Sequence, residues 1–182
     1  MGASPWNRLE RTVVHQNPFR RFLVDRVRIQ SGSEISYSWV DAAPAAFVVP
    51  LTADGRVILL RQYRYPIDRW VWEVPAGRIE GETVEETARR ELLEEVGGLA
   101  ARLTPLGSFF SAAAHLRLEC HAFLASGVEL AHPAEREATE LMEVRDLSAN
   151  EAFALARQGG DVEAQSALAL LMAEPVIREQ LR

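Results

Sequence analysis

The stretch that decides the fold is "GETVEETARRELLEEVG", residues 81–97. It opens with a glycine turn signal and continues with helical spacing, so we expect a helix that begins near Thr83 or Val84. From Glu80 to Glu95 the chain holds seven glutamates against two arginines. Like charges at helical spacing repel one another, so this concentration of carboxylates requires an explanation.

Helical geometry places three of these carboxylates on one stripe. At about 100° per residue, Glu94 and Glu95 lie about 60° and 40° to either side of Glu91. The side chains of Leu92 and Val96 fall on the adjoining face, where they can pack against a sheet. The stripe therefore presents a carboxylate cluster beside an apolar face.

Two other glutamates have favourable cationic neighbours. Glu85 with Arg89 and Glu86 with Arg90 are spaced as i,i+4 pairs. These pairs leave the three-carboxylate stripe without a compensating charge. The stripe is then either a solvated acidic face or a divalent-metal site. The preceding glycine-rich loop favours the metal site, because its backbone carbonyls can face an ion and oxygen ligands suit Mg²⁺ or Mn²⁺.

The run from Gly77 to Gly97 resembles the Nudix box, G-x5-E-x7-R-E-U-x-E-E-x-G-U, in which U is bulky and aliphatic. The positions that match from the first glutamate onward are Glu82, Arg90, Glu91, Leu92, Glu94, Glu95 and Gly97. Two positions depart from the pattern. Only four residues separate Gly77 from Glu82, and Gly98 replaces the last aliphatic residue, which we interpret as a helix-ending effect.

The order of predicted elements fits the fold that this resemblance implies. We expect the α/β (α+β) class: a Nudix αβα sandwich with a mixed β-sheet, preceded by an N-terminal antiparallel β extension. The expected division is an N-terminal unit over 1–43 and a Nudix hydrolase domain over 44–182. The predicted strands cover 19–29, 34–41, 45–51, 56–65, 70–77, 102–110, 116–125 and 139–147. Further helices are expected over 148–158, with a Ser148–Glu151 capping box, and over 161–181, bent or ended near Pro175.

Composition limits the function classes. The net charge of −6 and a pI near 5.3 argue against a general nucleic-acid-binding protein. Cys120 is the only cysteine, which excludes disulfides within the chain and fits a reducing compartment. No run of about 18 apolar residues and no signal-peptide pattern occurs. We therefore expect a cytoplasmic protein that binds neither nucleic acid nor membrane.

The Nudix resemblance implies hydrolysis of a nucleoside diphosphate linked to another group. By matching positions, Glu91, Glu94, Glu95 and the main-chain carbonyl of Ala76 would hold two or three Mg²⁺ or Mn²⁺ ions, and Glu94 also enters the candidate catalytic set. Such ions would neutralise the pyrophosphate charge and activate a water. Gly77, Glu82, Arg90 and Gly97 would be structural, with a Glu82–Arg90 ion pair that orients the loop.

Outside the box the chain is most similar to the ADP-ribose pyrophosphatase branch of the family. The similar segments are "LLRQYRYP" (59–66) and "WEVPAG" (72–77). The resemblance makes Arg64 a substrate-phosphate contact and Glu73 a residue near the site, although a strand-edge arginine paired with an acidic neighbour is the alternative for Arg64.

A late loop of the core should supply the catalytic glutamate in this branch. The candidates are Glu137, preferred as the general base, and Glu135, with an ordinary charged loop as the alternative. The branch also carries a proline–glycine pair and then a glutamate after "GSFF"; here Ala112, Ala113 and Arg117 stand in that region. The terminal sugar is therefore expected to be held differently.

The expected reaction is cleavage of a nucleoside diphosphate sugar, ADP-ribose first, to a nucleoside monophosphate and a sugar phosphate. The alternatives are a GDP-sugar or another nucleoside diphosphate-X hydrolase, and a non-catalytic sensor of ADP-ribose-like ligands. The branch also implies a homodimer formed through the N-terminal strands, with the base bound partly by the partner. Candidate base-stacking side chains are Trp6, Phe19, Tyr37, Trp39 and Trp70.

Overall fold

The computed structural model describes residues 4–134 and 141–182, and the chain forms two compact units. The first unit contains Met1–Ala43 together with Phe110–Glu119. The second contains Pro44–Phe109 together with Cys120–Arg182. The tip of one hairpin thus belongs with the N-terminal strands, although no local sequence signal separates 110–119 from its flanking strands.

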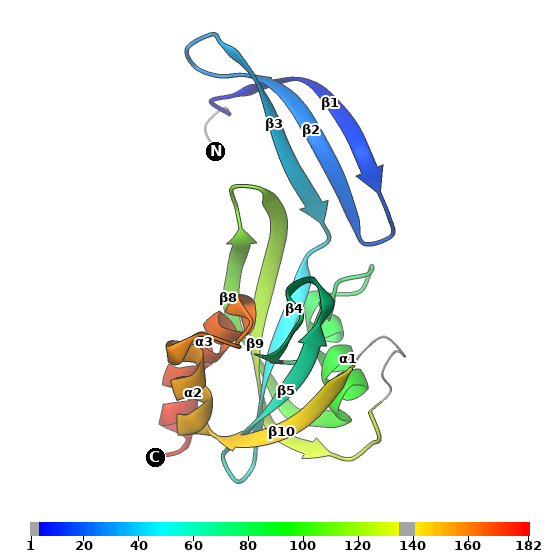
Figure 1. Ribbon diagram of the computed structural model, residues 1–182. Coiled ribbons are helices and arrows are strands. Elements are labelled where there is room, and N and C mark those ends of the chain that lie inside the picture. The colour runs from blue at the N-terminus through cyan, green and yellow to red at the C-terminus, as the bar shows by residue number, and fades with distance from the viewer. Residues whose placement is uncertain (1–3, 135–140) are drawn as a thin grey trace. The chain divides into compact units, whose positions relative to one another are not determined.

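The N-terminal unit is built on a three-stranded antiparallel meander of β1 (Asn7–Gln16), β2 (Arg20–Arg28) and β3 (Glu34–Ala42) (Figure 1). The end of β3 also pairs in parallel with the start of β9 (Leu116–Leu130). The sequence predicted β2 and β3 but not β1. Nine of the ten residues of β1 are exposed, so this strand lacks the alternation of buried and exposed positions by which a strand is predicted.

A mixed sheet forms the centre of the second unit. Its strand order is β9–β4–β5–β10, with β4 parallel to β9 and β5 antiparallel to both of its neighbours. β6 pairs with β5, β7 with β4, and β8 with β9. The remaining strands are β4 (Ala45–Thr52), β5 (Arg56–Arg64), β6 (Arg69–Glu73), β7 (Ala76–Arg78), β8 (Gly98–Ala112) and β10 (Met142–Ser148). Both β8 and β9 extend into the N-terminal unit.

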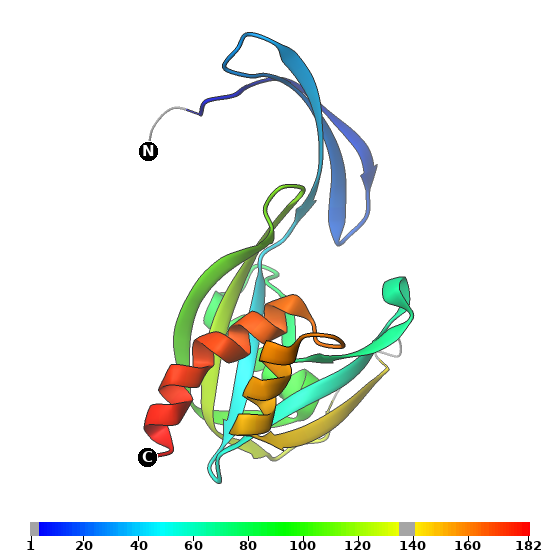
Figure 2. The same ribbon diagram turned by 60° about the vertical axis from the view of Figure 1, so that its left-hand side comes forward.

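Helices cover both faces of this sheet (Figures 1 and 2). α1 (Val84–Val96) lies on one face, and α2 (Ala149–Gln158) and α3 (Ala164–Gln180) lie on the other. Because both faces are covered, six consecutive residues of β4 are buried, which explains its continuous apolar run. The expected mixed-sheet sandwich is confirmed. Among the described residues, no helix is long and apolar enough to span a membrane.

The core beneath α1 explains why its apolar stripe is needed. Leu92 is 1% exposed and packs in a buried cluster that joins four strands to the helix. The other members of this cluster are Ala46, Val48, Ile58, Leu60, Ala88, Val96, Phe123, Ala125, Val128 and Met142. Burial of this face fixes α1 on the sheet and leaves its glutamate stripe beside β7.

The structure divides one predicted strand and excludes one of the two alternatives given for the last helix. The single strand expected over 70–77 is divided into β6 and β7, which pair with different strands, so Gly77 lies inside β7 rather than ending a strand. The last helix does not end at Pro175 but continues to Gln180. Proline removes one helical hydrogen bond, and burial of Ala173 and Ile177 holds the helix on both sides of it.

Candidate active site

The acidic helix begins as its sequence indicates. Thr83 is the N-cap, and its hydroxyl accepts from the Glu86 N–H at 3.2 Å while Glu86 accepts from the Thr83 N–H at 2.8 Å. This capping box uses the Glu86 carboxylate, so the expected Glu86–Arg90 pair is wrong. The expected Glu85–Arg89 pair is present at 3.0 Å. The Glu86 carboxylate therefore caps the helix instead of pairing with Arg90.

Arg90 organises the carboxylates instead. Its Nε and Nη2 atoms donate to Glu82 at 3.0 and 2.8 Å, which gives the predicted ion pair. Its Nη1 atom donates to Glu91 at 2.7 Å and to Glu94 at 2.9 Å. The expectation that the glutamate stripe lacks a compensating charge is therefore wrong. Arg90 and Glu94 are also spaced as an i,i+4 pair, but the sequence prediction pairs Arg90 with Glu86.

The Arg90 guanidinium also reaches the loop ahead of the helix, where Nη2 donates to the Arg78 carbonyl oxygen at 3.2 Å. Burial by itself lowers the pKa of Arg90, but the hydrogen bonds to Glu82 and Glu94 outweigh it and the net pKa is raised. The same ion pair lowers the pKa of Glu82. One arginine thus fixes the loop and the helix relative to each other, as a supporting contact for the stripe.

The three stripe glutamates differ in their surroundings. Glu91 and Glu95 are 8% and 7% exposed, whereas the Glu94 side chain is 42% exposed. A carboxylate oxygen of Glu95 accepts from the Ala76 N–H at 3.0 Å, which ties the end of α1 to β7. A Cβ atom at Gly77 would overlap with the Glu91 carboxylate. Glycine at this position is therefore a steric requirement for Glu91.

This donor set fits a divalent cation in its chemistry, since buried carboxylates beside a main-chain loop are the ligands that Mg²⁺ and Mn²⁺ take. Among residues 4–134 and 141–182, however, no three Asp, Glu, His or Cys side chains are grouped so that they could hold a metal ion. Arg90 and the Ala76 N–H hold the carboxylates in other directions. The donor chemistry suits a divalent cation, and the assignment of metal ligands stays a prediction.

The two predicted substrate residues bind each other. Arg64, at the end of β5, donates through Nε to one Glu73 oxygen at 2.6 Å and through Nη2 to the other. Glu73 is 5% exposed, while the Arg64 side chain is 47% exposed. Hydrogen bonding to Glu73 raises the pKa of Arg64, and the Glu95 and Glu163 charges add to this effect. The strand-edge pairing considered for Arg64 is present, and a substrate contact remains compatible with it.

Other predicted residues have mixed outcomes. Glu135 and Glu137 lie outside the described residues. Gly97 caps α1 in the left-handed region with φ +70°, and a Cβ there would overlap with the His132 carbonyl oxygen. The interpretation of Gly98 as a helix-ending residue is wrong, because it is the buried first residue of β8. A Cβ there would approach Leu92 and Val128 within 3.2 Å, which leaves little room for a larger side chain.

Sequence reasoning missed Glu163 and Ser166. Glu163 is the N-cap of α3, and its carboxylate accepts from the Ser166 N–H at 2.7 Å. Burial raises the pKa of Glu163. Ser166 is 1% exposed, and its hydroxyl accepts from the Val74 N–H, next to Glu73, at 3.1 Å. The available signal was an acceptor side chain three residues before Ser166 at the start of an apolar run.

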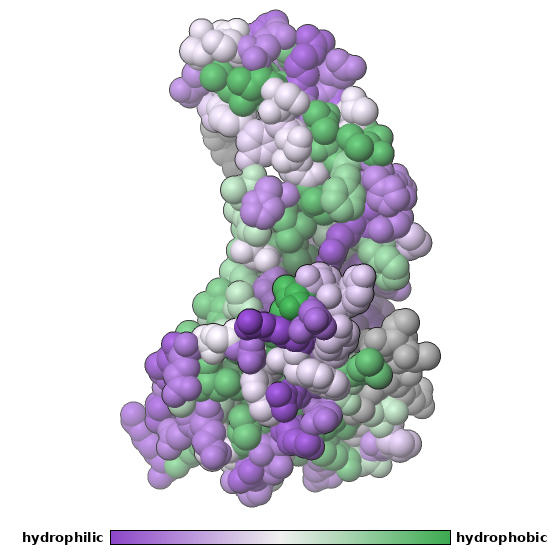
Figure 3. Space-filling view, in the orientation of Figure 1, coloured by the Kyte–Doolittle hydropathy of each residue, from purple (hydrophilic) through white to green (hydrophobic). Residues whose placement is uncertain are grey.

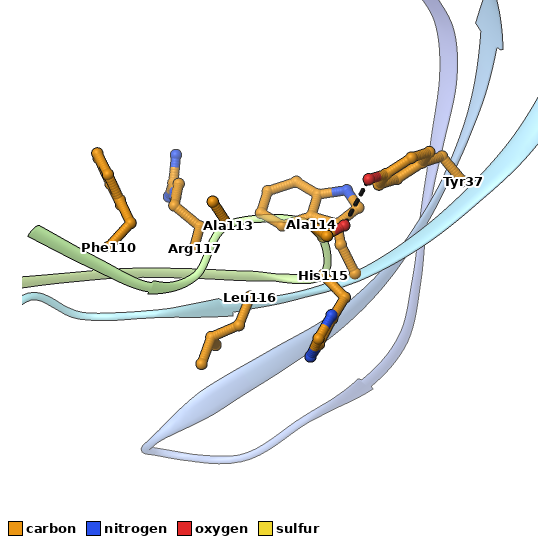
Figure 4. A pocket seen from close by; sticks show the side chains of 8 residues that line it. Tyr37, Phe110, Ala113, Ala114, His115, Leu116 and Arg117 are labelled. Atoms are coloured by element: carbon orange, nitrogen blue, oxygen red, sulfur yellow. Dashed lines mark hydrogen bonds between the residues drawn. The ribbon is translucent and has the colours of Figure 1, made fainter. Parts of the chain in front are cut away.

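The N-terminal unit contains a separate aromatic pocket of about 370 Å³ (Figure 4). Tyr37 and Trp39 come from β3, and the Tyr37 hydroxyl donates to the Ala114 carbonyl oxygen. The Arg117 guanidinium lies 5.7 Å from the Trp39 ring centroid, and its Nε donates to the buried Asp41 at 2.7 Å. The pocket is lined by Tyr37, Trp39, Phe110, Ala113, Ala114, His115, Leu116 and Arg117. Two of these residues, Tyr37 and Trp39, are among the five aromatic side chains that the sequence suggested for base stacking.

Comparison with known families decides the family of this chain. The NUDIX domain family model matches residues 41–164, well over half of the sequence. The chain belongs to the Nudix family. It is accordingly a pyrophosphohydrolase, and Nudix hydrolases generally use divalent metals.

Similar proteins support the same assignment. An ADP-ribose pyrophosphatase of Bacillus subtilis (strain 168) is 30% identical over 88% of this Nudix chain and 90% of its own length. A CMP-5'-(N-acetyl-N-hydroxy-3-aminopropyl)phosphonate hydrolase of Streptomyces rubellomurinus is 31% identical over 87% of this chain and 77% of its own. The crystal structure of an ADP compounds hydrolase has a TM-score of 0.84 at 22% identity, covering 99% and 98% of the two chains, which shows a shared fold.

Proposed function

We propose that this Nudix hydrolase cleaves the pyrophosphate bond of a nucleoside diphosphate sugar, with ADP-ribose as the first candidate. The products would be a nucleoside monophosphate and a sugar phosphate. The observation that carries the proposal is the Arg90-centred array, in which one guanidinium holds Glu82, Glu91 and Glu94 together. A relative named ADP-ribose pyrophosphatase that matches nearly the whole chain supports this choice of substrate.

Glu91, Glu94, Glu95 and the Ala76 carbonyl are our candidates to hold two or three Mg²⁺ or Mn²⁺ ions. Bound there, the ions would supply charge neutralisation at the pyrophosphate and lower the pKa of an attacking water. The chain's own contribution is positional. Gly77 leaves space for the Glu91 carboxylate, the Ala76 N–H orients Glu95, and Arg90 sets the loop against the helix.

Arg64 is our candidate for the contact to the substrate's phosphates. Glu73 uses the Nε and Nη2 edge of the guanidinium, which leaves the Nη1 side for an anion. Glu137 is the proposed general base, with Glu135 as its alternative. The rings of Tyr37 and Trp39 are the candidate stacking surface for a nucleobase.

A second candidate substrate class is a CMP-linked compound. The relative named as a CMP-phosphonate hydrolase matches this chain at an identity similar to that of the ADP-ribose pyrophosphatase. The departure at Ala112, Ala113 and Arg117 also alters the region in which the branch holds the terminal sugar. Comparison of substrates that differ in base and in terminal group separates the two classes.

The homodimer is likewise a proposal. Several apolar side chains of the N-terminal strands are exposed, and Figure 3 shows apolar residues among polar ones on the visible face of this unit. These exposed residues include Val13, Val14, Phe19 and Phe22. Pairing of these strands with a second copy would cover apolar surface that water otherwise meets.

The test of the activity is phosphate-coupled hydrolysis across ADP-ribose, ADP-glucose, GDP-mannose, a CMP-sugar, NADH and nucleoside triphosphates, with Mg²⁺ or Mn²⁺. We expect preferential cleavage of an ADP-sugar, and Glu95→Gln should lower kcat about 100-fold or more because it keeps shape and loses charge. Binding of ADP-ribose without turnover by the wild type would support a sensor instead. Full activity of Glu95→Gln would remove Glu95 from the metal set.

A further inference from the structure

The first turn of α3 holds the polypeptide on both sides of Glu73. The Glu163 N–H donates to the Trp72 carbonyl oxygen at 3.0 Å, and the Val74 N–H donates to the Ser166 hydroxyl at 3.1 Å. Trp72 and Val74 are the residues immediately before and after Glu73. Two hydrogen bonds from one helical turn therefore bracket the carboxylate that binds Arg64.

The bracketing turn is itself fixed by further hydrogen bonds. The Glu163 carboxylate caps the helix through the Ser166 N–H, at 2.7 Å. The Trp72 N–H donates to the Asp161 carbonyl oxygen at 2.8 Å, and Trp72 forms a parallel bridge with Val162. Because Ser166 is 1% exposed, loss of its hydroxyl would leave the Val74 N–H without that acceptor in a buried place.

Charge couples the same residues. The carboxylates of Glu73, Glu95 and Glu163 all raise the pKa of Arg64, with the Glu73 hydrogen bonds as the largest cause. Burial is the main cause of the raised pKa of Glu163, and the Glu73 charge contributes to it. The first turn of α3 is thus linked to the Arg64–Glu73 pair through hydrogen bonds to the backbone beside Glu73. It is also linked through the electrostatic effect of the Glu163 carboxylate.

We propose that Ser166 and Glu163 are positioning residues for substrate binding, which fix Glu73 and, through it, the direction of the Arg64 guanidinium. This inference rests on the proposed function, because it takes Arg64 as the contact to the substrate's phosphates. The physical reason is that a bidentate arginine–carboxylate pair is directional, so a shift of Glu73 turns the free edge of the guanidinium. Neither residue touches the substrate in this scheme.

The experiment measures steady-state KM and kcat on the preferred nucleotide sugar for single variants. Ser166→Ala and Glu163→Ala should each raise KM about fivefold to tenfold and change kcat less than about twofold, as expected for lost binding rather than lost chemistry. Ser166→Thr and Glu163→Gln keep an acceptor in the same place and should stay closer to wild type. Arg64→Ala should raise KM at least as much.

Ser148→Ala is the matched control, because Ser148 caps α2 through the same kind of side-chain hydrogen bond. It should lower thermal stability comparably and leave KM unchanged. In an Arg64→Ala background, Ser166→Ala should add little to KM, since the residue that it positions is gone. An unchanged KM in both Ser166→Ala and Glu163→Ala, or full additivity with Arg64→Ala, would overturn the inference.

Calorimetric titration with inorganic pyrophosphate and Mg²⁺ separates this inference from the activity itself. If no nucleotide sugar is cleaved but pyrophosphate affinity falls alike in Arg64→Ala and Ser166→Ala, the proposed function fails and the positioning role stands. If a nucleotide sugar is cleaved and Ser166→Ala behaves as Ser148→Ala does, the positioning role fails and the function stands. An Arg64→Ala variant with unchanged KM and pyrophosphate affinity also overturns the inference.

Discussion

Gly77 illustrates how one residue without a side chain shapes the box. Its φ lies outside the left-handed region, so backbone freedom does not explain the glycine. The explanation is space, because a Cβ atom would overlap with the Glu91 carboxylate. The obstructing group is the far end of a flexible side chain, so a larger residue would displace Glu91 at little cost to the fold.

We predict that Gly77→Ala lowers kcat about tenfold or more, while the free energy of unfolding changes by less than about 1 kcal/mol. Steady-state kinetics and urea unfolding measure the two effects. Gly81→Ala is the control in the same loop, because Gly81 has φ +98° and open space around it. It should cost about 1 kcal/mol through backbone strain and affect kcat far less. Equal losses of activity in both variants would contradict the steric role of Gly77.

At the scale of elements, ion pairs hold the exposed N-terminal meander together. Arg11 on β1 donates to both oxygens of Asp25 on β2, at 2.7 and 2.8 Å, and the Trp39 indole N–H on β3 donates to the same carboxylate at 3.0 Å. Asp25 is 7% exposed, and its carboxylate therefore joins all three strands. In a unit with little apolar burial, such a directional contact contributes more than a surface pair does.

Asp25→Asn should lower the free energy of unfolding by about 2 kcal/mol at neutral pH, since Arg11 loses a charged partner. Hydrogen bonding to Arg11 lowers the pKa of Asp25 in the folded state below its usual value of 3.8. The stabilisation is therefore complete above that value and is lost as pH falls through the folded-state pKa. Urea unfolding at neutral pH and near pH 3 should show a deficit that shrinks in acid.

The control for this pH effect is Glu10→Gln on the same sheet. Glu10 pairs with Arg26 at 3.3 Å, and both side chains are more than half exposed. This exposed pair should contribute less than about 0.5 kcal/mol at either pH. A deficit for Asp25→Asn that stays constant from neutral to acid pH would show that its charge does not matter.

At the scale of the whole molecule, the two units differ in what holds them together. The second unit has a sheet covered by helices on both faces and a continuous core. The N-terminal unit is mainly one sheet with several exposed apolar side chains, which a small β unit seldom leaves uncovered. This contrast underlies the proposal that a second copy completes the N-terminal unit.

Light scattering after gel filtration should therefore give about twice the chain mass of 20.3 kDa. Val14→Asp, at a valine that is 65% exposed on β1, should shift the mass toward that of one chain by placing a charge in the contact. Leu130→Asp, at a leucine 54% exposed in the second unit, is the control and should leave the mass unchanged. A single-chain mass for the wild type would exclude the homodimer.

The sequence by itself determined the features that depend on neighbours a few residues apart. The start of α1 and the Ser148–Glu151 capping box follow from capping residues and hydrophobic spacing. The mixed-sheet class was implied by the resemblance to the Nudix family. The Nudix box could be recognised for the same reason, because its residues share one helix and one loop.

Only the tertiary structure decided the partners of charged groups that meet from different elements. It closed Arg64 on Glu73 and brought the Glu95 carboxylate to the Ala76 N–H. It also brought Ser166, 92 positions along the chain, to the Val74 N–H. Local rules act within one or two turns, whereas these partners meet only after burial of α1 and α3 fixes the backbone, and the buried groups must then satisfy one another.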